Sequence, residues 1–202
     1  MKISRSLVAT LPILLTAGGI FASISSTRAF AGATASDTIP ILRIGNVPVL
    51  FEVSMVNWAM GFSCRGLCID SAGDVHVYDC TGLRDSLRQA KDDAERANIW
   101  ATRLALRDTV VMHIDTLELN SYLRLLPRVA GERVGPRKQT GADMGSTTFT
   151  AYWHDAPDSI GSQLLLGTFG DWTTKREGLN AAKLVEWLKQ IAAELEDVIF
   201  RK

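Results

Sequence analysis

Three cysteines lie close together in this chain, around one tight turn. The segment Asp70–Asp74 (D-S-A-G-D) places a glycine where a type I turn with a bulge needs a left-handed residue, and it joins two strands through three residues. Pairing the two ends of this turn sets Cys64 opposite Cys80, at a Cα separation that a disulfide tolerates. The sequence therefore predicts a hairpin of strands 64–70 and 74–80, closed by a Cys64–Cys80 disulfide.

Two other pairings stay open. A Cys64–Cys68 bridge requires a sharp bend at Gly66, and a Cys68–Cys80 bridge requires a shifted register. In the favoured pairing Cys68 keeps its thiol.

The first 31 residues indicate a compartment in which cysteines oxidise. Lys2 and Arg5 precede an apolar run over 7–24, and the small residues of Ala29-Phe30-Ala31 follow it. This is the three-part pattern of a secretory signal peptide cleaved after Ala31. An uncleaved membrane anchor is the alternative, and Pro12 and two glycines within the run weaken it.

The rest of the chain is long enough for one ordinary domain. We expect residues 1–31 to be the signal peptide, residues 32–40 a flexible lead-in and residues 41–202 a single α+β domain. The product should be periplasmic or secreted.

Charge excludes some classes of partner. The whole chain holds 22 basic and 22 acidic residues, and loss of the leader leaves 19 basic residues against 22 acidic ones, a net charge of about −3. Such a chain has no general attraction to nucleic acid or anionic lipid. We therefore expect neither nucleic-acid binding nor membrane association after cleavage.

Hydrophobic periodicity outlines the remaining elements. Strands are expected at 47–55, 110–114 and 146–154, with a further apolar run at 164–166. Helices are expected at 83–104, packed on the sheet by an alanine-rich seam, after an Asp115 cap as far as Pro127, and from an Asn180 cap onward. The predicted fold is an α+β sandwich, an antiparallel sheet of about five to six strands against two to three helices.

One connector carries side chains typical of protein interfaces. Between two strands lie Trp58, Met60 and Phe62. They predict a non-enzymatic domain that binds another exported protein, unless the connector folds back as a lid on the core.

A thiol enzyme or small hydrolase is the alternative function. The hairpin register puts Cys68 and His76 on one face, where an activated thiol or a Cys₃His metal site is conceivable. The segment 61–66 fails the G-x-S-x-G pattern because Arg65 stands in place of glycine. Phosphate-loop, dinucleotide and H-E-x-x-H patterns are absent from the sequence, so we expect no metal, no cofactor and, on balance, no enzyme.

The order of motifs resembles one family. The hairpin C-R-G-L-C-I-D-S-A-G-D-V, the helix L-E-L-N-S-Y-L-R-L-L, the strand T-F-T-A-Y-W and the helix A-K-L-V-E-W-L are similar to emfourin-like proteins. Those are small α+β inhibitors of bacterial metalloproteases. The resemblance implies an inhibitory role without assigning it to any residue, and the helix expected at 83–104 departs from the pattern.

Export can be tested on the native product. Mass spectrometry should find an N-terminus at Gly32 or, if the second small-residue stop at 33–35 is used, at Ser36. A mature protein that still carries residues 1–31 would show that the leader is an anchor.

Overall fold

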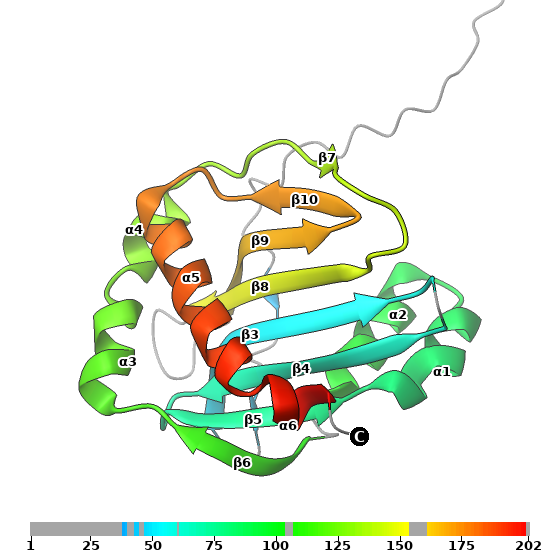
Figure 1. Cartoon of the computed structure of the whole chain (residues 1–202), viewed down its shortest axis with the longest axis horizontal. Coiled ribbons are helices and arrows are strands. Elements are labelled where there is room, and N and C mark those ends of the chain that lie inside the picture. Colours follow the sequence, from blue (N-terminus) through cyan, green and yellow to red (C-terminus); the bar gives the residue numbers. More distant parts are fainter. Residues whose placement is uncertain are drawn as a thin grey trace, which may run out of the picture. The chain divides into compact units, whose positions relative to one another are not determined.

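A computed structural model describes residues 38–39, 43–44, 47–59, 61–103, 107–153 and 161–200. Their centre is one antiparallel sheet with two longer strands near its middle, β3 (Val47–Asn57) and β9 (Gly161–Gly170). The main path of the sheet runs in the order β6-β5-β4-β3-β8-β9-β10-β7 (Figure 1). The other strands on this path are β4 (Ser63–Asp70), β5 (Asp74–Asp79), β6 (Arg107–His113), β7 (Lys138–Gln139), β8 (Ser146–Trp153) and β10 (Trp172–Lys175). Two short strands lie off it: β1 (Thr38–Ile39) pairs with β9, and β2 (Arg43–Ile44) with β3.

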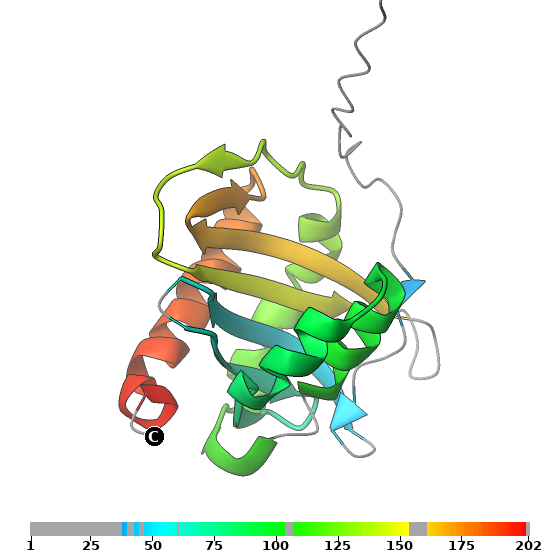
Figure 2. The ribbon, with the colours of Figure 1, turned by 90° about the vertical axis from the view of Figure 1, so that its right-hand side faces the viewer.

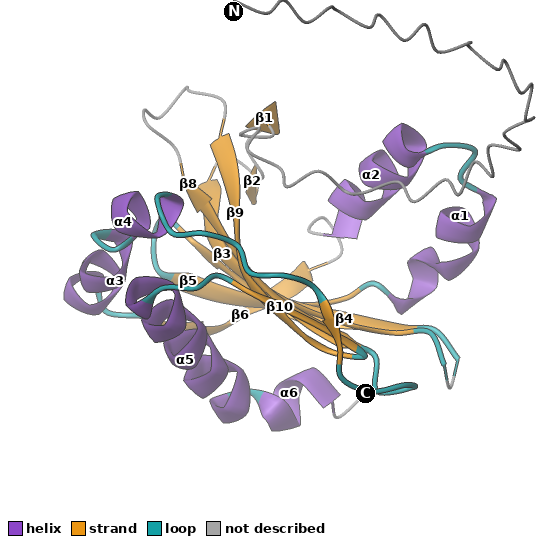
Figure 3. Cartoon of the chain, turned by 90° about the horizontal axis from the view of Figure 1, so that it is seen from above, coloured by secondary structure: helices purple, strands orange, loops and turns teal. Residues whose placement is uncertain are grey.

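Helices cover the sheet from both sides (Figure 3). One layer holds α3 (Thr116–Leu123), α4 (Leu126–Ala130), α5 (Leu179–Glu194) and α6 (Glu196–Phe200). The other holds the short pair α1 (Arg84–Gln89) and α2 (Asp93–Ala101), after a 3₁₀ turn at Thr81–Leu83. The predicted antiparallel α+β class is confirmed, with a larger sheet than expected and helices on both faces.

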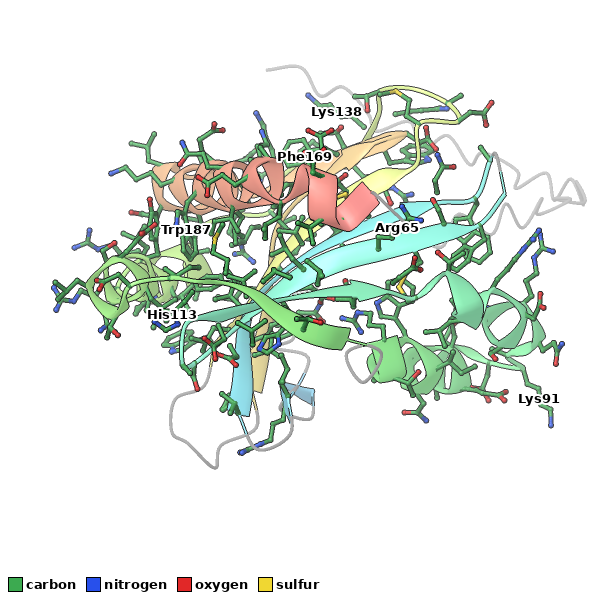
Figure 4. All side chains as sticks on the ribbon, turned by 60° about the horizontal axis from the view of Figure 1, so that its bottom comes forward. Arg65, Lys91, His113, Lys138, Phe169 and Trp187 are labelled. Carbon is green, nitrogen blue, oxygen red and sulfur yellow. A yellow bond between two sulfur atoms is a disulfide. The ribbon has the colours of Figure 1, made fainter. Side chains whose placement is uncertain are left out.

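The two faces bury two separate cores. Strand residues alternate between faces, so Phe51 and Val53 point to the α5 side. There Trp187 packs edge-on against Phe51 at 5.2 Å between ring centroids and stacks on Tyr122 at 4.1 Å. Figure 4 places Trp187 between α5 and the rest of this layer. The opposite face buries a smaller cluster that includes the three cysteines and Tyr152.

The cysteine hairpin is confirmed. Strands β4 and β5 pair with Cys68 opposite His76, as the turn predicts. Gly73 has φ +91°, the left-handed conformation that the turn requires. Beyond the ladder, Cys64 and Cys80 form the disulfide with Cα atoms 4.9 Å apart. This pairing rules out the two alternatives.

The predicted single helix at 83–104 is wrong. Helix α1 ends at Gln89. Asp92 then caps a second helix, α2, by accepting a hydrogen bond from the Glu95 N–H at 2.7 Å. The Glu95 carboxylate in turn accepts from the Lys91 N–H, a reciprocal bond like that of a capping box but to the residue before the cap. The expected alanine seam does not pack on the sheet: Ala94, Ala97 and Ala101 are exposed.

The cap of the last long helix comes from a distant loop. Helix α5 begins after Gly178, not at Asn180, and the Glu132 carboxylate accepts from the N–H groups of Asn180 and Ala181, at 3.1 Å each. A Cβ on Gly178 would overlap that carboxylate, so this glycine makes room for the cap. The negative charge at the helix start also complements the helix dipole.

Other predicted elements are present with shifted ends. Asp115 caps α3 through a 2.8 Å bond from the Leu117 N–H, and Pro127 lies in the first turn of the short helix α4 rather than only ending α3. The strands expected at 47–55, 110–114 and 146–154 correspond to β3, β6 and β8. The predicted signal peptide and nearly all of the predicted lead-in lie outside the described residues, so both stay predictions.

The disulfide should stabilise the fold through the loop that it closes. Its cysteines are 16 residues apart in sequence, for which chain entropy predicts about 3 kcal/mol. We expect a reductant to lower the free energy of unfolding by about this amount, measured by urea denaturation. The Cys64→Ser/Cys80→Ser double variant is the control: a reductant should not shift its curve. An equal shift in that variant would contradict the assignment.

Candidate functional site: a groove over the second face of the sheet

An open cleft of about 760 Å³ lies between the α1–α2 pair and the sheet. Its floor is formed by side chains of β3 and β8, among them Ser54 and Thr148. Its wall includes Leu87 from α1 and Ala97 and Trp100 from α2. Figure 2 shows the two helices crossing this face of the sheet.

The cleft exists because α2 meets the second core only at its C-terminal end. None of the side chains within α2 is fully buried, and only Ile99 and Trp100, in its last turn, pack against the core of this face. Lys91, at the connection from α1 to α2, lies far out from the sheet (Figure 4). The start of α2 therefore stands away from the sheet and leaves a space open to solvent.

A buried ion pair holds the end of α2 on the sheet. Arg103 Nε and Nη2 donate to the two carboxylate oxygens of Glu52 at 2.7 and 2.6 Å. The hydroxyls of Tyr78 and Tyr152 donate to the same oxygens at 2.7 and 2.6 Å. Arg103 Nη1 also donates to the Trp100 carbonyl, so the guanidinium joins the last turn of α2 to the middle of β3.

The surroundings of each group in this network fix its protonation state. Burial raises the pKa of Glu52, but the Arg103 guanidinium and the hydrogen bonds that the carboxylate accepts outweigh burial, so the pKa lies below its usual range. Burial and the negative charge of Glu52 hold the pKa of both Tyr78 and Tyr152 well above 10.0. Glu52 is thus ionised and the tyrosines are neutral donors, an arrangement suited to holding structure rather than to moving protons.

One hydroxyl on the cleft floor keeps hydrogen-bonding capacity. Ser54 is 8% exposed, and no hydrogen bond of good geometry satisfies its Oγ in the described part of the chain. Its interaction with the Tyr78 hydroxyl, which gives its own proton to Glu52, lowers the pKa of that tyrosine and partly offsets the effect of burial. Because a hydroxyl can both donate and accept, a ligand in the cleft could still pair with Ser54.

The cleft continues into a second hollow of about 570 Å³. Val56, Trp58 and Ser146 line both spaces, so the two form one groove along the sheet. The far side of the second hollow is lined by Trp172 and by Arg137, whose guanidinium lies 4.5 Å from the Trp172 ring centroid.

The predicted binding residues divide between the groove and the core. Trp58 is 50% exposed at the junction of the two hollows, and its ring packs on Phe62 at 4.3 Å between centroids. Phe62 is 7% exposed and belongs to the core of this face, which corresponds to the lid alternative. Met60 lies outside the described residues. The binding role of all three stays a prediction.

The residues of the alternative thiol site are neighbours in the sheet, but they do not reach the groove. Cys68 faces His76 across the ladder, and His76 Nε2 lies 3.1 Å from an Asp70 carboxylate oxygen, in the order of a Cys-His-Asp triad. All three residues are buried, and none of them lines either hollow of the groove. Because Cys64 and Cys80 are joined to each other, the conceivable Cys₃His metal set is also broken. Among the described residues no group of three or more metal-ligating side chains gathers around one point.

One feature of the sequence indicates a buried ion pair. Glu52 stands alone in the apolar run V-L-F-E-V, and a carboxylate inside a buried strand needs a charged partner. The partner could not be identified, because Arg103 is one of many arginines and lies 51 residues away.

The architecture is that of a small antiparallel α+β protein with a groove over one sheet face. Comparison with models of known families, with curated proteins and with solved structures finds no match. No helix among the described residues is long and apolar enough to span a bilayer. The resemblance to emfourin-like proteins therefore stays a prediction.

Replacing Glu52 should be strongly destabilising. Glu52→Gln leaves Arg103 buried without a counter-charge, which costs about 3–5 kcal/mol at neutral pH. The folded-state pKa of Glu52 is lowered, so the wild type keeps this stability above its unfolded pKa near 4.5 and loses it as pH falls through the folded value. Urea unfolding at several pH values should show a gap between wild type and variant that narrows on acidification.

The control is Asp93→Asn, the same chemical change on an exposed salt bridge to Arg96 in α2. It should alter stability little at any pH. If Glu52→Gln alters stability as little as this control, the buried pair does not hold the fold.

Proposed function

We propose that this chain is an exported, non-enzymatic binding protein, and that its partner lies in the groove beside Trp58. The observation that carries the proposal is the position of Trp58, a half-exposed indole at the junction of two connected hollows. Its packing against the buried Phe62 restricts the ring before any partner arrives. A restrained aromatic side chain loses little conformational entropy on binding and is typical of binding hot spots.

The groove favours an elongated partner. Together the two hollows extend from the α1–α2 pair to Trp172, with an apolar wall at Leu87 and Trp100 and a polar floor at Ser54 and Thr148. An extended segment of another exported protein, the partner predicted from the Trp58–Phe62 connector, has both kinds of surface. A metalloprotease, as implied by the emfourin-like pattern, would be one case.

Catalysis is the less favoured function. The charged groups on the cleft floor are neutralised by one another, and the Cys68 thiol has no opening onto the groove. A thiol nucleophile needs substrate access as well as a base, and neither hollow of the groove reaches Cys68.

Variants of α2 test whether the groove is the binding site. Ala97 is exposed and lines the cleft, so Ala97→Trp should fill it without disturbing a core. The matched control is Ala94→Trp, at an exposed position of the same helix that does not line the cleft. The immobilised exported product would be exposed to envelope and culture-fluid fractions of its source, and bound protein and carbohydrate would both be quantified.

We expect specific capture by the wild type and by Ala94→Trp. Capture should be lost with Ala97→Trp and reduced about tenfold with Trp58→Ala, all variants keeping the wild-type melting temperature. Capture that survives Ala97→Trp unchanged would contradict the groove as the site.

A further inference from the structure

A row of hydroxyl side chains crosses the groove floor. Ser54 pairs in register with Thr148, Thr148 with Thr168, and Thr168 with Thr174, so one hydroxyl comes from each of four adjacent strands. Ser54 and Thr148 line the cleft, and Thr168 and Thr174 line the second hollow. Neighbouring strands lie about 4.8 Å apart, a repeat similar to the length of one sugar ring in a linear chain.

These hydroxyls retain hydrogen-bonding capacity. The Oγ1 atoms of Thr148 and Thr168 lie 3.3 Å apart, so one donates to the other, and each hydroxyl can both donate and accept. Ser54 Oγ, buried at the cleft end of the row, interacts with the Tyr78 hydroxyl but makes no hydrogen bond of good geometry in the described part of the chain, so it can still pair with a ligand. The row therefore suits a ligand that presents many groups able to donate and accept.

Two tryptophans border the second hollow. Trp58 and Trp172 are 50% and 40% exposed. Phe62 packs on the first and Arg137 on the second, which restrains both rings while part of each stays accessible. The electron-rich face of an indole attracts the weakly positive C–H groups on the face of a sugar ring.

The charged side chains of this hollow nearly balance. It is lined by Arg137, Asp143 and Asp171, and within the described ranges none of these three takes part in a salt bridge. Asp171 Oδ1 accepts from the Met144 N–H, which leaves its second oxygen for another donor. One cation and two carboxylates can pair with hydroxyl groups without requiring a charged ligand.

We propose that the groove binds a linear, uncharged saccharide chain, with sugar faces on Trp58 and Trp172 and sugar hydroxyls along the Ser54–Thr174 row. This inference rests on the proposed binding role of the groove and goes beyond the protein partner proposed above, because it assigns the groove a saccharide ligand. A peptide suits the floor less well, since β3, β8 and β9 are each paired on both sides and offer no strand edge to a peptide backbone.

Calorimetric titration of the exported full-length product tests the proposal. The probes are cello-, chito-, xylo- and malto-oligosaccharides of four to six units. At least one series should bind with affinity that rises with chain length. Trp172→Ala should weaken that binding about tenfold, and Trp172→Phe should restore part of it.

A matched pair of variants tests the hydroxyl row. Thr168→Val removes one hydroxyl at nearly constant shape and should weaken binding about fivefold. Thr147→Val makes the same change on the opposite face of β8 and should leave affinity unchanged. Equal effects of the two variants would overturn the role of the row.

The outcomes separate this inference from the proposed function. If no probe binds while a protein is captured in a manner that Ala97→Trp abolishes, the saccharide is refuted and the binding function stands. If neither a saccharide nor a protein binds in the groove, both are refuted.

Discussion

The Glu52–Arg103 pair is the interaction on which the groove depends. Arg103 is the buried cation just beyond α2, and its two bonds to a carboxylate in the middle of β3 hold the end of a helix that otherwise packs weakly. Two tyrosine hydroxyls complete the hydrogen bonding of the carboxylate. A buried pair this fully satisfied specifies one position for α2, although replacing it with apolar residues need not lower stability.

The two faces of the sheet differ in role: one buries the main core, and the other carries the proposed binding groove. The α5 face is filled by a continuous apolar core, including the packed rings of Phe51 and Trp187. The other face has a smaller core around the disulfide. In the second hollow, the strands of this face carry hydroxyl side chains, among them Ser146, Thr168 and Thr174. A sheet stabilised from one side can leave part of the other uncovered, and the proposed binding groove occupies that part.

Local features were predictable from the sequence, and long-range ones were not. The hairpin, its register and the disulfide follow from one turn and the period of a strand, and the Asp115 cap follows from a local pattern. The start of a new helix at Asp92 was also visible, because Glu95 follows Asp92 by three residues. The continuous apolar period over 83–104 obscured this signal. Glu132 at the start of α5 and Arg103 beside Glu52 come from distant segments, as does the hydroxyl row, which needs the order of four strands.

Amide hydrogen exchange in the Glu52→Gln/Arg103→Met double variant tests most directly whether the ion pair positions α2. This variant removes both charges and keeps an acceptor for the tyrosine hydroxyls, so the sheet should remain folded. We predict faster exchange over residues 84–103, with β3, β8 and α5 protected as in the wild type. Wild-type protection of α2 in this variant would contradict the account, because α2 would then be held on the sheet without the pair.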